Sequence, residues 1–161
     1  MTDTKTIRAT LKNNGWNARA ISVREGRGGL SRSFTLTIRK RGISKKAVEA
    51  VAKTFDDIDR DERSGEILSG GNTFVFVEID RKVRDELKEE IRLAAPELDD
   101  IAAFYAMKEG EVRKFDIFGK CVAIEHSAGG PFLVIDGKPG RYLMAGHVSD
   151  EVATKLIEDG E

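Results

Sequence analysis

The sequence predicts an α+β protein, in which a mixed β-sheet is packed against helices. Two short segments, 19–25 and 33–39, alternate apolar and polar residues, as half-buried strands do. Two others, 44–55 and 81–95, repeat apolar residues at the spacing of an amphipathic helix. Because glycine-rich breaks separate these patterns, we expect an N-terminal α-β-β-α-β unit followed by a second αβ segment.

A length of 161 residues is typical of one domain, or of one domain with a small additional segment. We place the first unit at residues 1–80 and the second at residues 81–161, and the two can also form one compact body. In the first unit, the acidic segment 56–71 is expected to be a loop. The expected helices and strands of this unit are a helix over 4–14, strands over 19–25 and 33–39, a helix over 44–55 capped by Ser44, and a strand over 72–80.

The second segment is expected to hold helices, then strands, then a last helix. Pro96 is typical of a first helical position, and the apolar spacing after it continues to Lys108. Ser149 is expected to cap the last helix. The expected ranges are helices over 81–95 and 96–108, a strand region over 112–126 with a break near Phe118-Gly119-Lys120, strands over 132–135 and 141–145, and a helix over 150–157.

The predicted strand over 72–80 is apolar on both faces. If Val75, Val77 and Ile79 face the core, Phe74 and Phe76 project from the opposite face. Aromatic rings on an open sheet can stack the bases of a single-stranded nucleic acid. The outward neighbours on the adjacent strands suit such a platform: Ser22, Arg24, Thr35, Thr37 and Arg39. The alternative, which we favour, is that helices of the segment 81–108 bury both rings.

The charge of the chain is strongly asymmetric, although its net value is only −1. Residues 1–55 hold 13 basic and 3 acidic side chains, and the remainder holds 14 basic and 25 acidic ones. Such opposite fields indicate an electrostatic partner. The candidate contact surface is the basic hairpin loop and its flanks, over 24–41: Arg24, Arg27, Arg32, Arg39, Lys40 and Arg41. The alternative is that these groups pair with the acidic half of the same molecule or of a second copy.

Few residues suggest catalysis. Glu78, Asp80 and Lys82 at a strand end are typical of nucleases in which carboxylates hold Mg²⁺ and a lysine polarises water. That site needs a further acid, for which the candidates are Asp57, Asp59 and Glu66. The simpler interpretation is that Glu78 and Asp80 precede a helix and stabilise its N-terminal dipole.

The other residues that could take part in metal binding or catalysis are better explained by structural roles. The acids at 57, 59 and 61 lack the glycine and glutamate of a calcium loop. Cys121 is expected to be a buried, inert thiol, and a single cysteine excludes an internal disulfide. His126 and Ser127 are adjacent in sequence, which does not make a catalytic dyad. His147 is expected to be hydrogen-bonded and structural. We therefore expect no catalytic set, no metal site and no cofactor.

The first 80 residues resemble the large polyvalent protein-associated domain family. The similarity lies in Ile21-Ser22-Val23-Arg24, in Ser31-Arg32-Ser33 leading into the strand 34–37, in the helix 46–51 that ends at Phe55, and in Gly70-Gly71 before the strand 74–77. These modules occur in phage and plasmid genomes. The resemblance implies a mobile genetic element and a helper or counter-defence role, and it implies no reaction and no catalytic residue.

The expected function is therefore that of a non-enzymatic, phage- or plasmid-type accessory protein that binds nucleic acid, a host nucleoprotein or another protein through the basic loop. The alternatives are a metal-dependent nuclease that uses Glu78, Asp80 and Lys82, and a self-associating structural protein. No apolar run approaches the length that spans a bilayer, and the first residues carry no apolar segment typical of a secretory signal. We expect a cytoplasmic location without a membrane partner.

Overall fold

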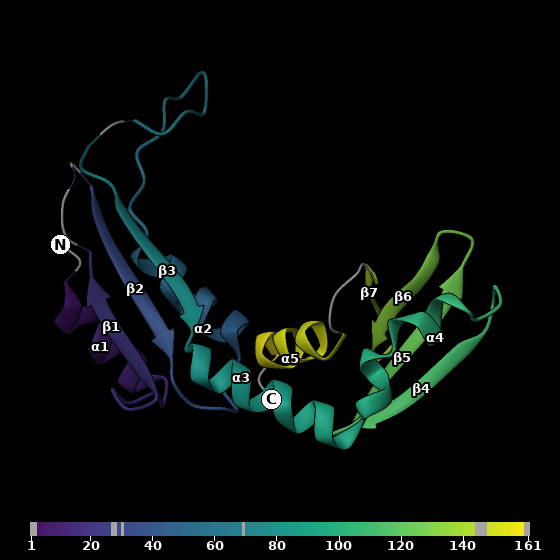
Figure 1. Ribbon diagram of the computed structural model, residues 1–161. Helices are drawn as coiled ribbons and strands as arrows, with labels where there is room; N and C mark the ends of the chain where they lie inside the picture. Colours follow the sequence, from purple (N-terminus) through teal and green to yellow (C-terminus); the bar gives the residue numbers. More distant parts are fainter. Residues whose placement is uncertain (1–2, 27–28, 30, 69, 144–147, 160–161) are drawn as a thin grey trace. The chain divides into compact units, whose positions relative to one another are not determined.

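The computed structural model describes residues 3–26, 29, 31–68, 70–143 and 148–159, apart from the side chain of Arg141. The predicted α+β class is confirmed, because helices are combined with one mixed and one antiparallel sheet in the described chain. The chain divides into two compact units, residues 1–83 with 157–161 and residues 84–156 (Figure 1).

The N-terminal unit has the predicted α-β-β-α-β order. Its first strand begins two residues later than expected, because the side chain of Asn17 accepts hydrogen bonds from the amides of Arg19 and Ala20 and holds them in a turn. Its elements are α1 (Thr4–Asn13), β1 (Ile21–Glu25), β2 (Arg32–Ile38), α2 (Lys45–Ala52) with the 3-10 turn η1 (Lys53–Phe55), and β3 (Thr73–Ile79).

Strand β2 lies between the other two strands of this sheet. It pairs antiparallel with β1 and parallel with β3, so that Leu36 is opposite Val23 on one side and Val77 on the other. A parallel pair needs a long crossover connection, which α2 and the acidic loop supply. The mixed sheet therefore follows from the helix between the second and third strands.

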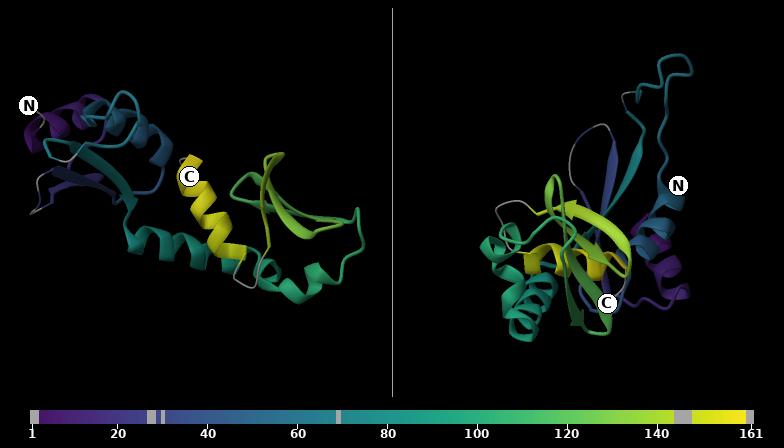
Figure 2. Two further views of the ribbon diagram at one scale, coloured as in Figure 1. Left: turned by 90° about the horizontal axis from the view of Figure 1, so that it is seen from above. Right: turned by 90° about the vertical axis from the view of Figure 1, so that its right-hand side faces the viewer.

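The helices α1 and α2 cover one face of this sheet, as the left view of Figure 2 shows. Phe34, Leu36 and Ile38 of the central strand are fully buried in this core, with Ile7 of α1 and Val48 of α2. Polar residues occupy the alternate positions of β2 because successive strand residues point to opposite faces. The outward positions of β2 are thus polar by the same alternation that buries its inward positions.

Both helices of this unit begin at a side-chain cap. The carboxylate of Asp3 accepts a hydrogen bond from the amide of Thr6 at 2.7 Å, and this bond holds the pKa of Asp3 below its ordinary value. The hydroxyl of Ser44 accepts one from the amide of Ala47, as predicted. The helix starts were therefore readable from the sequence.

The acidic segment between η1 and β3 is a hydrogen-bonded loop. The buried side chain of Asn72 accepts from the amide of Asp59 and donates to the carbonyl of Leu68. Asp57 bridges to Thr73, the first residue of β3. The loop therefore returns to the N-terminal end of β3.

The second unit consists of helices and an antiparallel sheet. Helix α3 begins in the first unit and continues into the second, and α5 begins in the second unit and ends in the first. The sheet follows the chain order β4-β5-β6-β7 in the described residues. The elements are α3 (Arg81–Ala94), the 3-10 turn η2 (Pro96–Asp99), α4 (Ile101–Tyr105), β4 (Val112–Ile117), β5 (Lys120–Ser127), β6 (Gly130–Ile135), β7 (Lys138–Tyr142) and α5 (Val148–Asp159).

The predicted boundaries need correction here. The expected helix over 96–108 is divided, because the side chain of Asp100 accepts from the amide of Ala103 and starts a new helix. The break expected near Phe118-Gly119-Lys120 is confirmed, because β4 and β5 form a hairpin whose turn places Phe118 and Gly119 at positive φ. The final strand, expected over 141–145, ends at residue 142, and residues 144–145 lie outside the described part.

Ser149 does not cap the last helix, because α5 begins one residue before it. Its amide and its hydroxyl both donate to the carboxylate of Asp99, which also accepts from Arg92 at 3.0 Å. Partial burial opposes the charge on Asp99, but these hydrogen bonds outweigh it, so the pKa of Asp99 lies below its ordinary value. Asp99 therefore joins η2, α3 and α5 within the second unit.

Candidate nucleic-acid interface on the N-terminal sheet

The outer face of the N-terminal sheet is built from rows of residues that cross its strands. One row runs from Ser22 on β1 through Thr37 on β2 to Glu78 on β3. The next row runs from Arg24 through Thr35 to Phe76 in the same register. The alternation of each strand brings these side chains to the face opposite α1 and α2.

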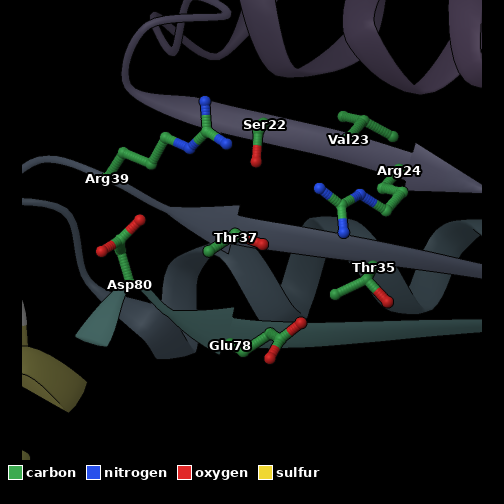
Figure 3. A pocket seen from close by; sticks show the side chains of 8 residues that line it. All are labelled: Ser22, Val23, Arg24, Thr35, Thr37, Arg39, Glu78 and Asp80. Carbon is green, nitrogen blue, oxygen red and sulfur yellow. The ribbon is translucent and has the colours of Figure 1, made fainter. Parts of the chain in front are cut away.

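This face contains a hollow with a volume of about 460 Å³ (Figure 3). Four charged side chains line it: Arg24, Arg39, Glu78 and Asp80. In Figure 3 the guanidinium of Arg24 points from β1 toward β2, and that of Arg39 lies beside Ser22. The hydroxyls of the two rows lie between these charges, so the hollow presents both donors and acceptors.

Most of these charged groups have no internal partner. Among the described residues, the side chains of Arg24, Arg39 and Glu78 form no hydrogen bond and no ion pair. Asp80 differs, because its carboxylate accepts from the amide of Lys82 at the start of α3. Exposed charged groups without an internal partner keep their hydrogen-bonding capacity for solvent or for an external ligand.

An aromatic surface adjoins the hollow along β3. The rings of Phe74 and Phe76 are nearly parallel, with 6.3 Å between their centroids and 16° between their planes. Phe76 is 56 % exposed, so the prediction that both rings are buried is wrong for this residue. Phe74 is half-buried. An exposed ring in the same cross-strand row as the Arg24 guanidinium suits a planar, anionic ligand.

The other predicted basic residues have different surroundings. Arg32 donates through Nε and Nη2 to the carboxylate of Glu25 and lies 5.2 Å from the centroid of the Phe34 ring. Lys40 and Arg41 are exposed in the connection between β2 and α2 and do not line the hollow. Arg27 lies outside the described residues. The basic stretch is thus divided, and Arg24 and Arg39 are the members that reach the hollow.

The structure does not bring together the residues proposed for a nuclease. Glu78 and Asp80 lie at the C-terminal end of β3, whereas Asp57 bridges to Thr73 at its N-terminal end. A strand of this length separates these groups by roughly 20 Å. In the described part of the chain, no cluster of three or more acidic, histidine or cysteine side chains could hold a metal ion.

Asp61, the last of the three alternate acids at 57, 59 and 61, forms hydrogen bonds within the acidic loop. The carboxylate of Asp61 accepts from the amides of Ser64 and Arg63, and these bonds lower the pKa of Asp61. Asp61, one of the acids whose surroundings do not match a calcium loop, therefore stabilises a turn of the loop.

The chemistry-bearing residues of the second unit do not form a dyad. The hydroxyl of Ser127 donates to the carbonyl of Gly130, and Nδ1 of the neighbouring His126 has no partner within the described residues. Cys121 is exposed, so the prediction of a buried thiol is wrong. It lies on β5 next to Val122, whose side chain is fully buried on the other face. His147 lies outside the described residues.

Sequence reasoning found the aromatic and basic parts of this face, and it singled out Glu78 and Asp80 only as candidate metal ligands, not as members of this face. Glu78 and Asp80 share the even-numbered positions of Phe74 and Phe76, and this parity was the available signal. Glu78 and Asp80 share the hollow with Arg24 and Arg39 because β3 pairs parallel with β2. Residue spacing along the chain does not predict this pairing.

Comparison with family models, with curated proteins and with solved structures found no match to this chain. No helix in the described ranges combines the length and the apolar character that crossing a bilayer requires.

Proposed function

We propose that this protein is a non-enzymatic module that binds single-stranded nucleic acid on the outer face of its N-terminal sheet. The observation that carries the proposal is an exposed aromatic ring, Phe76, in the same row as an unpaired guanidinium, that of Arg24. In single-strand binders, bases stack on such rings and cations neutralise the phosphates. The resemblance of residues 1–80 to phage- and plasmid-associated modules is consistent with an accessory role in a mobile genetic element.

The charge of the molecule favours a local contact over a broad polyanion surface. The net charge is −1, so no general attraction concentrates nucleic acid around the protein. The cations of the hollow share its lining with hydroxyls of β1 and β2, and the Phe76 ring on β3 lies in the same cross-strand row as Arg24. This combination suits the bases and phosphates of a few nucleotides rather than the continuous backbone of a duplex.

The test is fluorescence anisotropy with a labelled single-stranded octanucleotide of mixed sequence, as DNA and as RNA, and with the corresponding duplex. We expect the single strands to bind more tightly than the duplex. Phe76→Ala should weaken binding roughly 5- to 150-fold, which corresponds to about 1–3 kcal/mol for one stacked base. Phe118→Ala, which removes an exposed ring from the turn between β4 and β5, is the matched control and should leave binding unchanged.

The guanidinium groups are tested in the same assay. Arg24→Glu and Arg39→Glu should each weaken binding, whereas Arg63→Glu in the acidic loop makes the same charge change away from the face. Circular dichroism verifies that each variant is folded. Unchanged affinity in Phe76→Ala and Arg24→Glu together would refute the proposed interface. Capture of a protein but no oligonucleotide would instead favour a protein partner.

A further inference from the structure

We infer that the hollow recognises guanine, with the carboxylate of Glu78 accepting hydrogen bonds from the N1–H and N2–H groups of a base stacked on Phe76. This inference rests on the proposed function and adds a base preference to it. It follows from the position of one carboxylate beside the stacking ring, from its lack of an internal partner and from the donor pattern of the bases.

The first step is the position of Glu78. It follows Phe76 by two residues on β3, so both side chains lie on the same face, with Cα atoms about 7 Å apart. A base that covers the ring of Phe76 therefore directs an edge toward the carboxylate. The hydroxyl of Thr37, which pairs in register with Glu78, lies beside it as a donor for the guanine O6 (Figure 3).

The second step is the availability of the carboxylate. Glu78 is exposed and, in the part of the chain that the structure describes, makes no side-chain hydrogen bond or ion pair. Asp80 is less available for this role, because its carboxylate already accepts a hydrogen bond from the amide of Lys82 at the helix start. Glu78 is therefore the acid of the hollow with free acceptor oxygens.

The third step is chemical. A carboxylate accepts hydrogen bonds and donates none. Guanine presents two adjacent donors, N1–H and N2–H, on its Watson–Crick edge. Adenine has one donor beside one acceptor, cytosine has one donor followed by two acceptors, and uracil has one donor between two acceptors. Two adjacent acceptor oxygens thus match guanine and meet an acceptor atom on each of the other bases. The guanidinium of Arg24 can then bind the phosphate of the same nucleotide.

The experiment compares labelled RNA pentamers that carry guanine, inosine, adenine or uracil at the central position of a uridine strand. We expect the guanine pentamer to bind on the order of tenfold more tightly than the adenine and uracil pentamers, as one bidentate contact provides. Inosine lacks the N2 amino group and should bind with intermediate affinity. Unlabelled GMP should compete better than AMP, which tests whether the free nucleotide is recognised as well.

The variant Glu78→Gln should reduce the guanine preference to less than about twofold, because the amide replaces one acceptor oxygen by a donor. Glu78→Asp keeps the carboxylate but retracts it by one methylene and should weaken the preference partially. Glu62→Gln, in the acidic loop, removes the same charge away from the face and should leave the preference intact.

The outcomes separate this inference from the proposed function. Binding of all pentamers with equal affinity, or a guanine preference that persists in Glu78→Gln, overturns the inference and leaves the single-strand interface standing. Failure of every pentamer to bind refutes the proposed function. If GMP still binds in that case and loses affinity in Glu78→Gln, guanine recognition stands for the free nucleotide.

Discussion

Asp99 shows how one residue can join elements that are distant in sequence. Its carboxylate accepts from the backbone and hydroxyl of Ser149, fifty residues later, and from the guanidinium of Arg92. The bond to Asp99 also raises the pKa of Arg92 above its ordinary value. The spacing of these residues along the chain gave no reason to expect this contact.

The first prediction concerns Asp99→Asn. The substitution should lower the free energy of unfolding by about 1–3 kcal/mol at neutral pH, because charged acceptors are lost from a partly buried cluster. The folded-state pKa of Asp99 is depressed, so its stabilisation is present above the unfolded-state pKa of about 4 and is lost as the pH falls through the folded-state pKa. Urea unfolding monitored by circular dichroism at pH 7 and pH 3 should show a difference between variant and parent that shrinks at pH 3.

The same comparison has a clear control. Asp116→Asn changes an acid whose carboxylate accepts from the amide of Gly119 in an exposed turn, and it should cost less. A loss in Asp99→Asn that is equal at both pH values would contradict the ionised, hydrogen-bonded state described for Asp99.

The second prediction at this scale concerns Cys121. The side chain is exposed on β5, so native protein should react completely with an aromatic disulfide reagent, one thiol per chain, at a rate close to that of urea-unfolded protein. Absorbance of the released thiolate measures it. Protection of the thiol until denaturant is added would place Cys121 in the interior instead.

At the scale of elements, single capping residues predicted some helix ends and not others. Ser44 caps α2 as predicted, and its hydroxyl also donates to the carbonyl of Glu158, which is in the same compact unit. Asp100 divides a helix that the apolar spacing alone had made continuous. The cap at Ser44 was therefore predicted correctly, whereas the cap expected at Ser149 is wrong. The cap at Asp100 was missed because the apolar repeat continues across it.

The third prediction is that Ser44→Ala destabilises the N-terminal unit by about 1 kcal/mol, through loss of the cap acceptor. Urea unfolding followed by fluorescence of Trp16, which packs against this core, measures the change. Ser44→Thr retains the hydroxyl and should recover most of the stability. Equal losses in both variants would show that the hydroxyl does not cap the helix.

At the scale of the whole molecule, the opposite charges of the two parts of the sequence cancel only in part. Lys46 pairs with Asp159 at 2.6 Å, which is a contact of the kind that internal neutralisation requires. Arg32 instead pairs with its neighbour Glu25, and Arg24 and Arg39 have no partner among the described residues. Exposed pairs of this kind contribute little stability, so they do not by themselves hold the charged parts together.

The fourth prediction follows from the small number of available cations. If Arg24 and Arg39 each contact one phosphate, the logarithm of the association constant should fall with the logarithm of salt concentration with a slope of roughly −1.4. Anisotropy titrations between low and moderate salt measure this slope. A slope several times steeper would indicate a broad polybasic contact. Light scattering over the same range tests the alternative of salt-sensitive self-association.

The sequence alone determined the α+β class, the order of the N-terminal elements and the outward direction of Phe74 and Phe76, because these depend on periodicity and on single capping residues. The tertiary structure alone decided that Glu78 and Arg24 share a hollow, that the ring of Phe76 is exposed and that Asp99 binds Ser149. Periodicity determines which face of a strand a residue occupies. Which strands become neighbours, and which groups remain unpaired on that face, depends on contacts between segments far apart in the chain.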